Sequence, residues 1–319
     1  MKIVFRNTPF TVCQKKILSE LCASGGYEYK WYEKGEEVLL KDLSDAEALM
    51  GYFPVPLLKS LSNLKWHQVP SAGVDSLCGD IYHDDSVVLT NSSGAFGTAI
   101  AEYMLTGILM LMRNMPAYMK NQRAHIWQED QPSRTIYKSI ITVVGTGDIG
   151  SAFAKRAKAM GAYIRGVKRT PCAPNEIFDE IYTTSDLKTA VRNADAVVMS
   201  LPGTKETCKI LSKEIIGAMD KKTILVNCGR GITVDEDALI SALKDKKIAG
   251  AVLDVCKTEP LGKESPLWDM ENVVLTPHIS GRDTTPVNAE RIFEIFKENL
   301  TRFIEKRNLV NVVDRNLGY

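Results

Sequence analysis

The most constraining feature of the chain is the stretch from Ile140 to Gly150, where an apolar run leads into three spaced glycines. Residues 140–144 (IITVV) are mostly β-branched, which indicates a buried strand. A glycine-rich turn and a helix-like segment, 151–161 (SAFAKRAKAMG), follow, and 163–167 reads as a second strand. This order predicts a dinucleotide-binding unit, whereas the alternative is an ordinary glycine-rich turn.

The three glycines have G-x-G-x-x-G spacing, and each has a separate expected role. Gly145 permits the tight turn out of the strand, Gly147 lets the backbone approach a pyrophosphate, and Gly150 lets the helix pack against the strand. The pyrophosphate is expected at the helix N-terminus, where free N–H groups and the helix dipole favour an anion.

Composition and charge exclude several classes of function. The 319 residues are enough for two domains, and a net charge of +1 favours neither nucleic acid nor a membrane surface as a partner. We find no leader segment and no apolar run of spanning length, and the seven scattered cysteines lack a C-x-x-C pair. We therefore expect a cytoplasmic protein with reduced thiols. The four histidines lack metal-ligand spacing, so no metal site is expected.

The chain alternates strand-like and helix-like segments, which predicts parallel α/β sheets. The first part, residues 1–97, lacks a phosphate loop and ends in the small, flexible segment 90–97 (TNSSGAFG). From Ile140 onward six strands with intervening helices predict a doubly wound nucleotide domain within 98–282. The predicted strands are 140–144, 163–167, 196–200, 223–226, 248–255 and 273–276.

One predicted helix, 98–114, is apolar around most of its surface, and Pro116 is expected to end it. Such a helix is either buried or shared with another subunit. An amphipathic segment, 117–123, and Trp127 follow it. We favour a homodimer contact here, and the alternative is a simple core helix.

Three polar side chains follow neighbouring strands in the second half of the chain. Arg230 lies past one strand, Glu259 past the next and His278 past the last. Arginine can hold a carboxylate with two hydrogen bonds, histidine can exchange a proton with an alcohol, and a glutamate can orient the imidazole. Taken singly, each has an ordinary interpretation: a surface arginine, a structural histidine and a solvated glutamate.

These segments together resemble the D-isomer-specific 2-hydroxyacid dehydrogenase family. The matching motifs cover nearly the whole chain in family order: PSAGVD, TNSSG, VVGTGDIG, NCGRG, GAVLDVCKTEPL, SPLW and NVVLTPHISG. The resemblance implies two Rossmann-like domains. A cofactor domain, 98–282, would be inserted into a flavodoxin-like substrate domain made of residues 1–97 and completed by 283–319. It also implies dimers formed through the cofactor domain.

The resemblance carries the catalytic roles onto Arg230, Glu259 and His278, with Arg230 and His278 also contacting substrate and cofactor. It places the substrate carboxylate on the backbone of Ala72 and Gly73. Tyr52 and Phe53 lie in the substrate-facing region, where they line the side-chain pocket or belong to the core. Cofactor contacts are assigned to the motif glycines Gly145, Gly147 and Gly150 and to Asp148, Ile149, Leu201, Pro202, Thr207 and Gly229. The resemblance assigns contacts with the nicotinamide to Thr98, Cys228 and Asp254.

Two positions depart from the family pattern. Asp283 stands where a threonine often follows the catalytic histidine. Many NAD-binding members have an acid at the end of the second nucleotide-domain strand, but here Lys168, Arg169 and Thr170 occupy this place. Two cations and a hydroxyl favour a 2′-phosphate, hence NADP over NAD, and the alternative is a solvated basic turn.

The sequence therefore predicts an NADPH-preferring reductase of small 2-keto acids such as glyoxylate or hydroxypyruvate. Its products would be D-2-hydroxy acids. The alternative function is a dinucleotide-sensing binding protein, because corepressor relatives have the same fold and triad.

Overall fold

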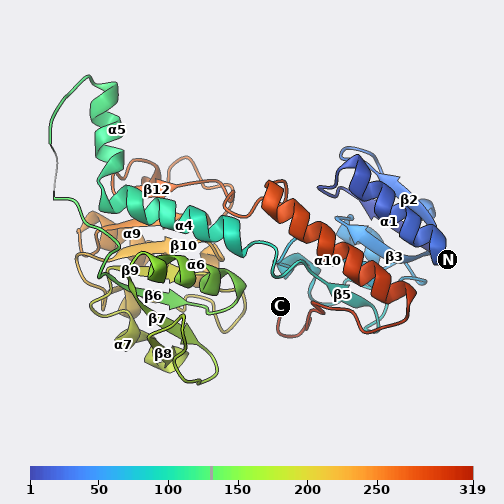
Figure 1. Cartoon of the computed structure of the whole chain (residues 1–319). Coiled ribbons are helices and arrows are strands. Elements are labelled where there is room, and N and C mark those ends of the chain that lie inside the picture. The colour runs from blue at the N-terminus through green and yellow to red at the C-terminus, as the bar shows by residue number, and fades with distance from the viewer. Residues whose placement is uncertain (130–131, 319) are drawn as a thin grey trace. The chain divides into compact units, whose positions relative to one another are not determined.

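The computed structural model describes residues 1–129 and 132–318, which form two compact units. One unit contains Met1–Phe96 with Arg282–Tyr319, and the other is the continuous stretch Gly97–Gly281 (Figure 1). Both breaks lie one residue from the positions expected above. Among the described helices, none is both long enough and apolar enough to cross a membrane.

The first unit is a five-stranded parallel sheet with strand order β2-β1-β3-β4-β5. This is the order of flavodoxin-like folds. The strands are β1 (Lys2–Arg6), β2 (Glu28–Tyr32), β3 (Ala46–Gly51), β4 (Trp66–Gln68) and β5 (Val88–Thr90), and the helices are α1 (Val12–Ser24), α2 (Leu40–Leu43), α3 (Val55–Leu58) and α10 (Pro286–Ile304).

The C-terminal segment belongs to this first unit because it supplies one of its covering helices. α10 runs beside α1 (Figure 1) and packs Phe293 and Phe296 edge-on against Phe10. Its buried Asn299 donates a hydrogen bond to the Gln68 side chain on β4, at 2.8 Å. These contacts anchor the end of the chain to a sheet built from its beginning.

His67 on β4 is completely buried, and both of its ring nitrogens have partners. Nε2 lies 3.0 Å from the Gly51 carbonyl and Nδ1 lies 2.9 Å from the Tyr82 hydroxyl. A carbonyl only accepts, so Nε2 carries the proton and Nδ1 accepts from the tyrosine. Burial lowers the pKa of His67 from 6.5 to about 4. The imidazole is therefore neutral in the folded protein at neutral pH.

We expect this histidine to make the first unit less stable in acid. The unfolded chain takes up a proton near pH 6.5 but the folded unit does not, so stability is complete above that pH and falls as the pH decreases toward 4. The unfolding free energy should drop by about 2 kcal/mol between pH 7 and pH 5 from this group. Denaturant unfolding of His67→Gln should show a flatter pH dependence, while the exposed control His125→Gln keeps the wild-type slope.

The second unit is a seven-stranded parallel sheet in the order β12-β11-β10-β9-β6-β7-β8. The strands are β6 (Ile140–Val144), β7 (Tyr163–Lys168), β8 (Glu180–Thr183), β9 (Ala196–Met199), β10 (Ile224–Asn227), β11 (Gly250–Leu253) and β12 (Val273–Leu275). The helices are α4 (Gly97–Met112), α5 (Met115–Arg123), α6 (Asp148–Ala159), α7 (Leu187–Ala190), α8 (Lys213–Ile216) and α9 (Glu236–Lys244).

Helices cover both faces of this sheet, as the continuous apolar strands require. Neighbouring residues of a strand point to opposite faces. Val144 and Leu253 join the core formed with α7, α8 and α9. On the other face, a Cβ added to Gly150 of α6 or Gly107 of α4 would contact Val143 or Val252, respectively. α4 and α6 lie side by side on this face (Figure 1).

Two details of the second unit differ from the sequence expectation. The described part of the sheet has seven strands, because β8 pairs with the edge of β7. Its four residues, EIYT, mix polar and apolar side chains, so it lacks the continuous apolar run of a strand such as β6. α4 ends at Met112, and Pro116 lies in the first turn of α5 instead of only ending α4. Proline fits there because the first helical N–H groups have no intrahelical acceptor.

Candidate active site

The glycine-rich loop after β6 has the close packing that its spacing predicts. Gly145 has φ +100° and donates a backbone hydrogen bond to Val167, at 2.9 Å, so the turn runs tightly past β7. A Cβ on Gly150 would lie 1.9 Å from the Gly145 carbonyl oxygen. Only glycine at position 150 lets α6 start this close to the strand.

The N-terminus of α6 is suited to a dinucleotide pyrophosphate. Gly147 is the N-cap and gives the helix no side-chain cap, so the first N–H groups are not occupied by one. A Cβ on Gly147 would meet no atom within 4 Å, which leaves open space beside the backbone. The Asp148 carboxylate lies against Gly97 at the start of α4. Asp148 and Ile149 therefore present their backbone, the part of a helix start that binds an anion.

Lys168, Arg169 and Thr170 stand at the end of β7, the strand that follows α6. Lys168 is the last residue of β7, opposite Thr183 of β8, and is partly buried. Arg169 and Thr170 are exposed. The charge of Arg169 reaches Glu206 and contributes, after the stronger effect of hydrogen bonds to that carboxylate, to lowering the pKa of Glu206.

The loops after β6, β9 and β10 pack closely against one another. A Cβ on Gly229 would lie 2.5 Å from the Leu201 carbonyl oxygen, and one on Gly145 would lie 3.0 Å from the Leu201 side chain. Thr207 closes the loop after β9 by donating from Oγ1 to the Pro202 carbonyl, at 2.6 Å. Five residues assigned to the cofactor therefore line neighbouring strand ends, where doubly wound sheets bind ligands.

His278 and Glu259 form a hydrogen-bonded pair at the ends of β12 and β11. His278 Nδ1 lies 2.8 Å from Glu259 Oε2. The other carboxylate oxygen, Oε1, accepts from the Cys256 backbone N–H at 3.1 Å, which fixes the acid. Because an ionised carboxylate only accepts, Nδ1 carries a proton and Nε2 is left for a substrate. Half of the His278 side-chain surface is accessible, so solutes can reach the ring.

The loop that carries His278 is held by the buried carboxylate of Asp254. Oδ1 accepts from Thr276 Oγ1 at 2.7 Å and from the Ile279 N–H at 2.8 Å, and Oδ2 accepts from the Ser280 N–H at 2.9 Å. His278 itself has φ +52°, a left-handed conformation that is rare for residues other than glycine. The Asp254 side chain, assigned to the nicotinamide from the sequence, is thus engaged with this loop.

Arg230 lies in the loop after β10, directly beside the Glu259 loop. The next residue, Gly231, passes so close to Cys256 that a Cβ on it would lie 1.9 Å from the Cys256 carbonyl oxygen. Asn227 and Thr233 both donate hydrogen bonds to the Arg230 carbonyl, at 3.0 and 2.6 Å. The structure therefore brings the loops of all three predicted catalytic residues together within one unit.

A cavity of about 490 Å³ opens beside the histidine–glutamate pair. Its wall is mostly apolar, and Asp254 and Thr276 reach it as well as the pair itself. Cys228, another predicted nicotinamide contact, is buried next to Asp254, and burial raises the pKa of its thiol far above the ordinary value. Thr98 lies in the first turn of α4 and is partly buried.

The predicted substrate residues Tyr52, Ala72 and Gly73 lie in the other unit. The N–H groups of Ala72 and Gly73 donate no hydrogen bond within residues 1–129 and 132–318. Asn91 instead holds this loop by donating to the Ala72 carbonyl, at 2.8 Å. Two unused neighbouring donors match the predicted binding of an anion.

Tyr52 and Phe53 differ in their surroundings. Phe53 is buried in the hydrophobic core of the first unit, so the core interpretation holds for that residue. Tyr52 is partly exposed and its hydroxyl is hydrogen-bonded to the Ser71 side chain. Burial of the ring, opposed by this hydrogen bond and reinforced by the charge of Asp283, raises the pKa of Tyr52.

Comparison with known proteins shows which family the chain belongs to. The family model for the NAD binding domain of D-isomer specific 2-hydroxyacid dehydrogenases matches residues 105–280, more than half of the chain. The chain belongs to the D-isomer-specific 2-hydroxyacid dehydrogenase family. A glyoxylate reductase from Thermofilum pendens is 31% identical over 297 residues, with 89% of this chain and 86% of that protein covered.

Two solved structures of this dehydrogenase family have the same fold over nearly their whole length. A family protein from Aeromonas salmonicida has a TM-score of 0.86 at 29% identity and covers 98% of this chain and 99% of its own. One from Xanthobacter autotrophicus Py2, solved with NADPH and MES, has a TM-score of 0.83 at 29% identity, with coverage of 100% and 99%. The chain spans only 56% of the length of the D-3-phosphoglycerate dehydrogenase of Methanocaldococcus jannaschii, to which it is 29% identical.

Sequence reasoning missed two residues whose hydroxyls are hydrogen-bonded toward the loop that carries His278. Thr276 belongs to the quoted LTPH motif but received no role, and Tyr103 appeared only within an apolar helix. The Tyr103 hydroxyl lies 2.5 Å from Thr276 Oγ1. The tyrosine within a largely apolar helix could have indicated this contact, because a partly buried hydroxyl needs a hydrogen-bond partner.

Proposed function

We propose that the chain is an NAD(P)-dependent reductase that converts small 2-keto acids, such as glyoxylate or hydroxypyruvate, into D-2-hydroxy acids. The supporting observation is the pair of His278 and Glu259, at 2.8 Å, in the same unit as a glycine loop suited to pyrophosphate. The glyoxylate reductase relative supports the substrate class. Turnover of a panel of 2-keto acids tests the proposal and separates it from a binding protein, which would show none.

Each residue of the site has a definite task in this reaction. The nicotinamide dinucleotide, when bound, supplies the hydride that reduces the keto carbon. Arg230 holds the substrate carboxylate and carbonyl with its planar pair of N–H donors. His278 donates the proton on Nε2 to the forming alkoxide, and Glu259 stabilises the charged imidazole through Nδ1.

NADPH is the proposed preferred cofactor because of the residues that follow the second strand. An acid at the end of β7 would accept from a 2′-hydroxyl and repel a 2′-phosphate, but Lys168, Arg169 and Thr170 stand there. Glu206 lies near Arg169, so Lys168 is the clearer phosphate contact. The NADPH in the Xanthobacter relative agrees with this assignment.

We expect kcat/KM to be at least about tenfold higher with NADPH than with NADH at low salt. A charge-assisted hydrogen bond contributes about 1.5–3 kcal/mol, and even a solvent-screened bond near the lower value gives one factor of ten. Lys168→Asp should reverse the preference. Lys221→Asp makes the same charge change in an exposed turn before β10, at the other end of the strands, and should leave the preference intact. A wild-type preference for NADH would refute the assignment.

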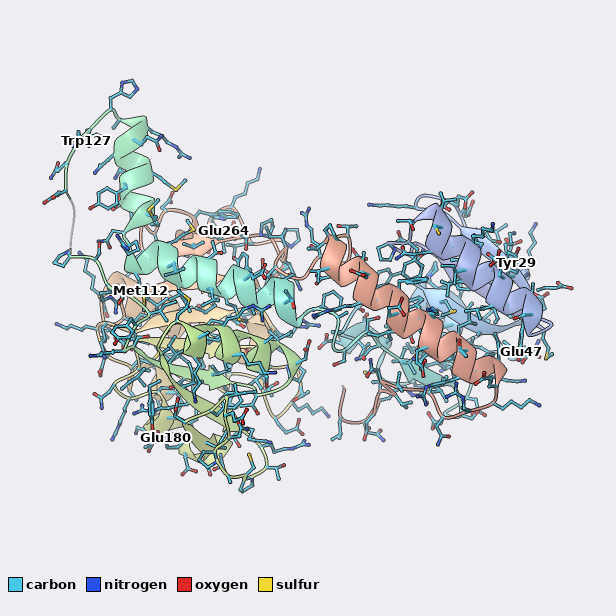
Figure 2. The ribbon with its side chains drawn as sticks, viewed as in Figure 1. Tyr29, Glu47, Met112, Trp127, Glu180 and Glu264 are labelled. Carbon is cyan, nitrogen blue, oxygen red and sulfur yellow. The ribbon has the colours of Figure 1, made fainter. Side chains whose placement is uncertain are left out.

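We also propose a homodimer formed through the second unit, Gly97–Gly281, which we call the cofactor unit. No residue of α5 is buried, and Trp127 beyond it is fully exposed and points away from the rest of the chain (Figure 2). Met115, Met119 and Ile126 are exposed on the same arm. Isolated proteins rarely leave so much apolar surface in one place uncovered. Sedimentation analysis measures the mass, and a monomer at all concentrations would contradict the proposal.

A further inference from the structure

The hydroxyl of Tyr103 is connected to the loop of the catalytic histidine. Tyr103 projects from α4 and its hydroxyl lies 2.5 Å from Thr276 Oγ1, which donates to Asp254 Oδ1 at 2.7 Å. A threonine hydroxyl has one proton, and here that proton goes to the carboxylate. Tyr103 is therefore the donor to Thr276. The phenol, the threonine and the carboxylate form a chain of hydrogen bonds with a single direction.

The same carboxylate fixes the backbone on both sides of His278. Asp254 accepts from the N–H groups of Ile279 and Ser280 at 2.8 and 2.9 Å, and its own carbonyl accepts from the His278 N–H at 2.8 Å. The left-handed conformation of His278 costs energy and persists only where the surroundings impose it. These bonds impose it, and they fix the direction from which the ring meets Glu259.

Tyr103 and the loop that it reaches lie next to the two points where the polypeptide passes from one unit to the other. The polypeptide passes between the two units twice, at Phe96–Gly97 and at Gly281–Arg282. Tyr103 is on the second turn of α4, shortly after the first passage, and Ser280 lies immediately before the second. Within the second unit, these hydrogen bonds therefore link Tyr103, which follows the first passage, to Ser280, which precedes the second.

We propose that Tyr103 is a positioning residue for the reaction. Its hydroxyl holds Thr276, and through Thr276 and Asp254 it keeps the loop 276–280 in the form that presents the His278 ring to Glu259 and to the substrate. This inference rests on the proposed reductase activity. Tyr103 contacts neither the pair nor, in this role, the reacting atoms, so its removal should affect the chemical step more than cofactor binding.

The decisive variant is Tyr103→Phe, which deletes only the hydroxyl and keeps the packing of the ring. We expect kcat for keto-acid reduction to fall about tenfold, as for other residues that orient a catalytic group, with KM for the dinucleotide within about twofold. Independently of turnover, the amides of Ile279 and Ser280 in the cofactor-free protein should exchange hydrogen about five- to tenfold faster. The control is Thr106→Ala, because the Thr106 hydroxyl donates to the Glu102 carbonyl within α4, at 2.8 Å.

A double-mutant comparison shows whether Tyr103 acts through Thr276. Thr276→Val should reduce kcat at least as much as Tyr103→Phe, and Thr276→Ser should restore it because the hydroxyl returns. Combining Tyr103→Phe with Thr276→Val should cost no more than Thr276→Val alone. Additive losses, or an unchanged kcat and amide exchange in Tyr103→Phe, would overturn the inference. If the wild-type chain turns over no keto acid, the proposed reaction is wrong, and the amide exchange still decides whether Tyr103 holds the loop.

Discussion

Replacing His278 with alanine is expected to lower kcat for 2-keto acid reduction by roughly 10²–10⁴-fold, the range typical of a lost general acid. The reason is that Nε2 is the donor that Glu259 leaves available, since Nδ1 is bound to the carboxylate at 2.8 Å. NADPH affinity should change little, because the glycine loop and the start of α6 lie at other strand ends.

Steady-state kinetics and a cofactor titration of His278→Ala measure both expectations. His125→Ala is the matched control, because His125 is exposed just after α5 and far along the chain from any site residue. A kcat of the variant close to the wild-type value would show that another group donates the proton. A large loss of NADPH affinity with an intact kcat would place His278 in cofactor binding instead.

The second large effect is expected for Arg230→Lys. The substitution keeps the positive charge but removes the planar pair of donors that fits a carboxylate. The loop is rigid, because Asn227 and Thr233 hold the Arg230 carbonyl, so a lysine cannot recover the geometry by moving the backbone. We expect kcat/KM for 2-keto acids to fall by roughly 10²-fold or more, since both bonds of the fork contribute.

The measurement for Arg230→Lys is kcat/KM with a 2-keto acid at saturating NADPH, together with the Kd for NADPH. Only the first should change. Arg192→Lys, at an exposed position on the same unit, provides the control. If Arg230→Lys keeps the full kcat/KM, the substrate carboxylate binds elsewhere, and the N–H groups of Ala72 and Gly73 would then be the first alternative to examine.

The elements that the sequence predicted well are buried ones, because burial requires an apolar run or a glycine that can be seen in the sequence. β6 begins and ends at the residues expected from its β-branched run, and the glycines after it show the predicted close approaches. β8 was missed because its sequence, EIYT, mixes polar and apolar residues and shows no apolar run, so its strand conformation is evident only from its pairing with β7.

Partnerships between distant residues were harder to foresee. Glu259 and His278 were expected to meet because both follow neighbouring strands. The buried carboxylate of Asp254, by contrast, was assigned to the nicotinamide, and its bonds to Thr276, Ile279 and Ser280 depend on the left-handed turn at His278. The sequence around His278 does not predict that turn, because position 278 holds no glycine, the residue that adopts positive φ most readily.

The way the C-terminal segment completes the first unit has a consequence for the order of assembly during synthesis. Residues 1–96 leave the ribosome first, but their sheet lacks α10 until the last forty or so residues follow. Phe296 and Leu300 are buried, and Asn299 bonds to Gln68 on β4. The inserted unit, in contrast, is one continuous segment, and everything it needs has been synthesised by residue 281. The part of the chain made first is therefore the part that finishes folding last.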